Sequence, residues 1–118
     1  MNKYKIVYVK DNYIDFINDY PNIIKSLLIE EKSMFDSKQL NLLFDNNEKA
    51  KDYFKRDLFL REDYYYFHGI HKLENSITNK NITFIMNQYD IEVHDCSDNY
   101  IIFEYLKSYS SNFFMFNI

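Results

Sequence analysis

Residues that bend or cross-link a chain are scarce in this sequence. Its 118 residues include one glycine, one proline and one cysteine, and no tryptophan. A single glycine excludes a glycine-rich phosphate loop and the Gly-x-Ser-x-Gly motif of many hydrolases. A single cysteine, Cys96, excludes an intramolecular disulfide framework and favours a reducing compartment.

Long apolar runs are also missing. No run approaches the roughly 20 residues of a membrane-spanning helix, and the N-terminal MNKYKIVYVKDN lacks the apolar stretch of a secretion signal. We therefore expect a cytoplasmic protein. The hydrophobic fraction of 47% and the charged fraction of 27% are typical of a chain that folds, and residues 1–118 fit one domain.

Asparagine, isoleucine, lysine, tyrosine and phenylalanine are abundant, while glycine, proline, alanine and arginine are rare. This bias follows codon composition and is typical of an A+T-rich gene, as in many bacteria and phages. The aromatic fraction of 19% therefore says little about function by itself.

The apolar pattern of the first half predicts one strand followed by helices. KYKIVYV alternates in the way of a strand with a buried face. Up to Phe59 the apolar spacing then lengthens to three and four residues, which predicts three or four helices. Pro21 suits the first turn of the second helix, and Asp36 and Asp45 suit the starts of later ones.

Beyond Glu62 the pattern favours strands separated by Asn-, Asp- and Ser-rich turns. The predicted strands are YYYFHGI, ITFIM, IEVHD, YIIFEYL and NFFMFNI, the last one buried at the end of the chain. Asp95–Asn99 predicts a hairpin turn between two of them. Lys72–Tyr89 is compatible with strand or helix. The whole pattern predicts an α+β fold with an N-terminal strand, helices, and then a mainly antiparallel sheet.

The net charge of −4 is unevenly distributed. Residues 1–80 contain thirteen acidic and thirteen basic side chains, whereas residues 81–118 contain five carboxylates and Lys107 alone. Such a concentration would steer a basic partner to one face and repel nucleic acid. We therefore predict that a binding face includes Asp90, Glu92, Asp95 and Asp98.

A second acidic row has helical spacing. Asp11, Asp15 and Asp19 recur every four residues, so a helix would place them on one side. We interpret this row as an ordinary solvated face, with Asp11 as a cap, and we prefer this interpretation to the alternative of an interface.

The segment DYYYFHGIHK raises three possibilities: an active site, part of a metal site, or an aromatic strand. A zinc site is a weak alternative that would join four residues: His68, His71, His94 and Cys96. A histidine-based acid–base site is another alternative, but few cationic side chains accompany it for a phosphate substrate. We favour an aromatic strand, with Tyr64 and Tyr66 on one face as contacts for a partner.

The sequence therefore predicts a small acidic binding protein, not an enzyme, with no cofactor. We expect it to inhibit a basic protein by occlusion, without membrane or direct nucleic-acid binding. In size and composition it resembles immunity proteins that neutralise bacterial nuclease toxins, for example those of contact-dependent inhibition. A phage inhibitor of a host defence nuclease, or a small histidine- or metal-dependent enzyme, is the alternative.

Overall fold

In a computed structural model, which describes residues 2–29, 40–75, 80–96 and 100–118, a six-stranded antiparallel sheet forms the centre of the molecule. The strands follow the order β2-β3-β4-β5-β1-β6. Their bounds are β1 (Asn2–Tyr8), β2 (Tyr64–Phe67), β3 (Ile70–Asn75), β4 (Lys80–Met86), β5 (Ile91–Asp95) and β6 (Phe113–Asn117). The predicted α+β fold is confirmed.

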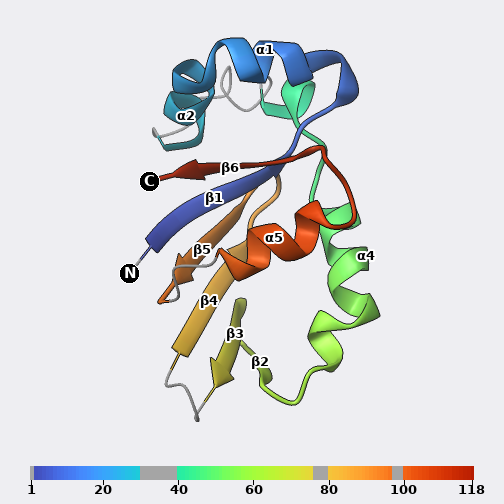
Figure 1. The fold of residues 1–118 in the computed structure, drawn as a ribbon, viewed down its shortest axis with the longest axis vertical. Helices are drawn as coiled ribbons and strands as arrows, with labels where there is room; N and C mark the ends of the chain where they lie inside the picture. Colours follow the sequence, from blue (N-terminus) through green and yellow to red (C-terminus); the bar gives the residue numbers. More distant parts are fainter. Residues whose placement is uncertain (1, 30–39, 76–79, 97–99) are drawn as a thin grey trace.

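The helices lie in two groups (Figure 1). A 3-10 turn, η1 (Asp11–Tyr13), leads into α1 (Ile14–Asp19) and α2 (Pro21–Ile29), which lie at the β1–β6 end of the sheet. The second group, α4 (Glu48–Arg56), η2 (Leu58–Leu60) and α5 (Ile101–Lys107), packs against one face. As predicted, α2 begins at Pro21, where the missing N–H costs no helical hydrogen bond.

Strand β1 contributes to two separate cores because its side chains alternate between the two faces of the sheet. Tyr4 and Ile6 pack under α4 and α5, together with Phe54, Phe84 and Leu106. On the other face, β1 joins α1 and α2 in a second core, which contains Val7, Val9, Ile17, Ile24, Leu40, Leu43, Phe44 and Phe116. The first helical segment is therefore anchored to the sheet independently of α4 and α5.

Several predicted elements need correction. Ile101–Lys107 is helix α5 and not a strand, because Ile102 and Leu106, one helical turn apart, fill the core under it. No β-hairpin therefore follows β5; of the predicted turn, residues 97–99 lie outside the described part. In the described parts of Lys72–Tyr89, the residues up to Asn75 belong to β3 and Lys80–Met86 to β4, so strand and not helix is formed there.

The single glycine explains another difference. Tyr64–Ile70, predicted as one strand, is split into β2 and β3 by a two-residue turn at His68 and Gly69. Both residues have positive φ, 49° and 81°, as a type I′ turn requires. Phe67 and Ile70 then face each other across the hairpin.

Of the two aspartates predicted to cap later helices, the structure describes only Asp45. Asp36 lies outside the described residues. Asp45 does not cap α4, which begins three residues later, at Glu48. Its carboxylate instead accepts a hydrogen bond from Lys49 at 3.1 Å. The backbone N–H of Glu48 instead donates a hydrogen bond to Asn46 Oδ1 at 3.4 Å.

Candidate functional site

The predicted acidic binding face is not formed by Asp90 and Asp95, because both carboxylates are buried, with exposures of 1% and 0%. Asp95 shares the covered face of β5 with Ile91 and Val93, following the alternation of a strand. Glu92 points to the opposite face, is half-buried, and lies 3.9 Å from His94 Nε2. Asp98 lies outside the described residues.

Asp90 organises the turn between β4 and β5. Asn87 Nδ2 donates to its carboxylate at 2.8 Å, and Lys5 Nζ lies 3.7 Å from the other oxygen. Its carbonyl accepts hydrogen bonds from the Asn87 N–H and from Asn47 Nδ2, at 2.9 and 2.7 Å. Asp90 therefore has a structural role, because it connects the start of α4 to the sheet.

An exposed acidic surface is found instead on the first helix. Asp11, Asp15 and Asp19 are all exposed, and Ile17, buried on the opposite side of α1, fixes the helix to the sheet. Asn112 Nδ2 donates to Asp11 at 2.6 Å and so connects η1 to the segment before β6. The predicted solvated face is confirmed for Asp15 and Asp19 on α1. Asp11 is exposed as well but lies in η1, and it is not the predicted cap, since the N-cap positions of η1 and α1 are Lys10 and Tyr13.

Aromatic and aliphatic side chains accompany these carboxylates. Phe16 is 38% exposed, Tyr20 52% and Ile23 54%, and the rings of Phe16 and Tyr20 are 5.2 Å apart. Residues 11–24 contain no lysine, arginine or histidine. We call these six residues the α1–α2 surface: Asp11, Asp15, Phe16, Asp19, Tyr20 and Ile23. The i, i+4 spacing of aspartates in the sequence was its only clear signal.

The tyrosine strand has the predicted alternation but a different exposure. Tyr64 and Tyr66 share the helix-covered face of β2, where Tyr64 is half-buried and Tyr66 is exposed. Tyr65 and Phe67 occupy the open face and are exposed. Tyr64 packs on Phe59, with ring centroids 4.8 Å apart, so it is a structural contact more than a surface one.

The four residues of the alternative zinc site do not converge. His71 is on the helix-covered face of β3, His94 is on the open face of β5, and His68 is in the exposed β2–β3 turn. Cys96 follows the end of β5 and is exposed. Among the described residues, no group of three or more histidine, cysteine or acidic side chains is placed to hold a metal ion.

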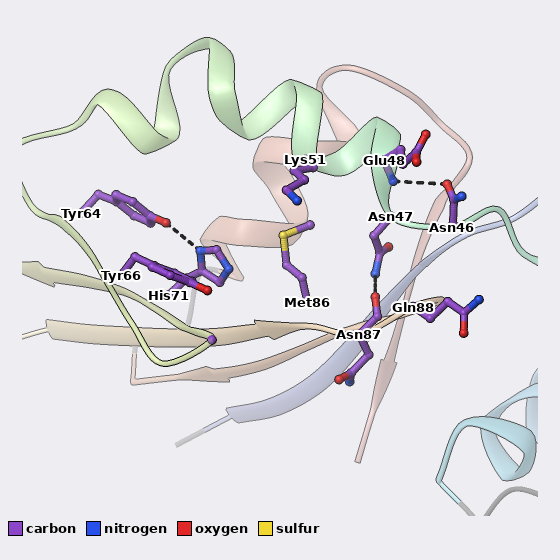
Figure 2. A pocket seen from close by; sticks show the side chains of 11 residues that line it. Asn46, Asn47, Glu48, Lys51, Tyr64, Tyr66, His71, Met86, Asn87 and Gln88 are labelled. Atoms are coloured by element: carbon purple, nitrogen blue, oxygen red, sulfur yellow. Dashed lines mark hydrogen bonds between the residues drawn. The ribbon is translucent and has the colours of Figure 1, made fainter.

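A pocket of about 610 Å³ surrounds His71 at the N-terminal end of α4 (Figure 2). The start of α4, strands β2 and β3, and the end of β4 form its walls. His71 is 9% exposed and stacks between Phe59 and Phe84, whose ring centroids are 5.4 and 4.7 Å away. Its Nδ1 is 2.7 Å from the hydroxyl of Tyr64.

The protonation states in this pocket follow from burial and charge. Burial, with the nearby positive charge of Lys51, lowers the pKa of His71 below its ordinary value, so the imidazole is neutral at pH 7. Burial raises the pKa of the Tyr64 hydroxyl, so the phenol keeps its proton.

None of the described helices is long and apolar enough to cross a membrane. No known family model matches the sequence, and a comparison with curated proteins finds no match.

Proposed function

We propose that this protein binds a basic protein through the α1–α2 surface and inhibits it by occlusion. The supporting observation is that Asp15 and Asp19 are exposed on the same short helix as Phe16 and next to Tyr20, and residues 11–24 contain no cationic side chain. Lysines lie at the borders of this surface: Lys10 and Lys49 share a hollow with Asp11, and Lys25 follows on α2. Carboxylates steer a basic partner and set its orientation, and rings add rigid apolar contact area. Polar and aromatic groups side by side are typical of protein contacts.

A nuclease-type toxin is the partner class that best matches this chemistry. An active-site cleft that binds phosphate is basic, and a row of aspartates can take the place of the phosphates. We therefore propose a cytoplasmic immunity protein that acts without a cofactor and is not itself an enzyme. A phage inhibitor of a host nuclease would use the same surface chemistry.

The binding residues in this proposal differ from those predicted along the sequence. Asp90 and Asp95 are omitted because a partner docked on the folded protein cannot contact them. Glu92 is on the open sheet face with His94 and Lys72 and belongs to a surface of mixed charge. The aspartates of η1 and α1 replace them as the acidic contacts.

The test is capture of the partner by the tagged protein from a lysate of its native cells, followed by mass spectrometry. The double variant Asp15→Lys, Asp19→Lys should lose the captured protein, and high salt should release it from the wild type. The captured protein should be basic, and the wild type should inhibit its activity on nucleic acid. With purified partner, the double variant should associate at least about tenfold more slowly at low salt.

The matched control is Asp52→Lys, Glu104→Lys, which makes the same charge change on α4 and α5. Both residues are exposed and lie on helices remote from α1. The control should keep the captured protein. Equal loss in both variants, a captured partner that is not basic, or no captured partner at low salt would contradict the proposal.

A further inference from the structure

The pocket around His71 has the dimensions and lining of a small-molecule site, separate from the α1–α2 surface. Its volume of about 610 Å³ lies within the range of small-ligand pockets, about 300 to 1,000 Å³. Regular elements form it: β3 is paired on both sides, with β2 and β4, and α4 is held by the buried Ala50 and Phe54. One polar side chain in it, His71, is more than nine-tenths buried.

The hydrogen bond between Tyr64 and His71 links the hydroxyl proton to the tautomer of the imidazole. When the phenol, whose pKa is raised by burial, donates to Nδ1, the single proton of the neutral imidazole is on Nε2. Nε2 points into the pocket toward Met86 and contacts no acceptor in the described part of the chain (Figure 2).

A donor that faces an accessible pocket can bond to water or to a ligand oxygen that displaces the water. Lys51 reaches down from α4 on the same side of the pocket and adds a positive charge. The carboxylate of Glu48, the acidic residue of the lining, points away from His71 in Figure 2. The groups around Nε2 therefore favour an anionic oxygen.

The remaining side chains that line the pocket could pack against a planar ring of a ligand. The Tyr66 ring, 61% exposed, forms one wall, with its centroid 4.8 Å from that of His71. Met86 lies across the floor and offers a soft apolar surface. The amide of Asn47 is already engaged by the carbonyls of Asn87 and Asp90, so this side is fixed.

We propose that this pocket binds a small aromatic ligand that carries an anionic oxygen, as a carboxylate or a phosphate. The oxygen accepts hydrogen bonds from His71 Nε2 and the Lys51 ammonium group, and the flat body packs on Tyr66 and Met86. The site requires no metal and no contact with the α1–α2 surface.

The test uses two anionic probes, 4-hydroxybenzoate and adenosine 5′-monophosphate, with 4-hydroxybenzamide and adenosine as their neutral counterparts. Long-range ¹H–¹⁵N correlation spectra of the imidazole report the tautomer and the binding. In the free protein, His71 should carry its proton on Nε2, and Nδ1 should be unprotonated. At least one anionic probe should shift the Nε2 signal and bind at least about tenfold more tightly than its neutral counterpart. The probe that does so shows whether the anionic oxygen of the ligand belongs to a carboxylate or to a phosphate.

Three variants locate the binding. His71→Phe keeps a flat ring but removes the donor, and Lys51→Met removes the charge from an exposed position where folding is not at risk. Each should weaken binding of the anionic probe, by about tenfold for His71→Phe. Lys55→Met, one turn further along α4 and outside the lining, should leave it unchanged. An Nδ1–H tautomer, no shift with either anion, equal binding of the neutral probes, or unchanged binding in Lys51→Met would overturn the proposal.

Discussion

The α1–α2 surface and the β4–β5 region are both rich in carboxylates, yet the fold places them in opposite environments. Asp15 and Asp19 are exposed on a helix, whereas Asp90 and Asp95 are buried at the two ends of a strand. The sequence shows more net charge in the second region, but among the described residues the first region has more exposed carboxylates. Charge counted along a chain therefore predicts a binding face only when the phase of the helix or strand is known.

The largest expected contrast is in stability. Asp90→Ala removes the acceptor of Asn87 and leaves Lys5 beside a buried space, so the free energy of unfolding should fall by about 2 kcal/mol. Asp19→Ala, at an exposed helix position, should change it by less than about 0.5 kcal/mol. Urea denaturation of the three proteins measures both values. Similar losses in the two variants would remove the distinction between the regions.

A smaller effect should come from the partner of Asp90. Asn87→Ala removes the amide that donates to the carboxylate, and we expect a loss of about 1 kcal/mol. Asn18→Ala, exposed on α1, is the matched control and should be neutral. Thermal unfolding in parallel samples would show the difference. An Asn87→Ala protein as stable as the control would mean that the β4–β5 turn does not depend on this bond.

The smallest expected effect is on the pH dependence of stability, and it comes from the buried imidazole of His71. Because the pKa of His71 is lowered in the folded protein, the unfolded chain binds this proton more tightly. The free energy of unfolding should therefore decrease as the pH falls below about 6.5, until His71 is protonated in the folded state as well. His71→Phe should show a smaller decrease between about pH 7 and pH 5. Parallel pH dependences in the two proteins would contradict a buried neutral imidazole at this position.

Much of the fold could be predicted because alternation and helical spacing are local signals. β1, β4 and β5 follow the apolar alternation, β6 is a short run of strand-favouring apolar residues, and Pro21 marked the start of α2. Helix α5 could not be predicted in the same way, since Ile101, Ile102 and Tyr105 favour strands by intrinsic preference. Packing against the sheet through Ile102 and Leu106 overrides that preference.

The positions of the acidic residues and of the His71 pocket were harder to predict. They depend on which face of each strand is covered by helices. The alternation in IEVHD already groups Asp95 with Ile91 and Val93, and this signal pointed to burial. Gly69 is the one local signal for a turn between β2 and β3, and it does not indicate that the resulting hairpin brings Tyr64 to His71. That contact depends on positive φ at His68, which histidine adopts more readily than most residues but which no pattern reveals.

Carboxyl labelling of the folded protein with a carbodiimide and an amine, read by peptide mass spectrometry, tests the central claim most directly. We predict that Asp15 and Asp19 are modified as fast as in the urea-unfolded chain, while Asp90 and Asp95 are strongly protected. Addition of the captured partner should then protect Asp15 and Asp19. Rapid labelling of Asp90 and Asp95 in the folded protein, or no protection of the α1 aspartates by the partner, would contradict the account.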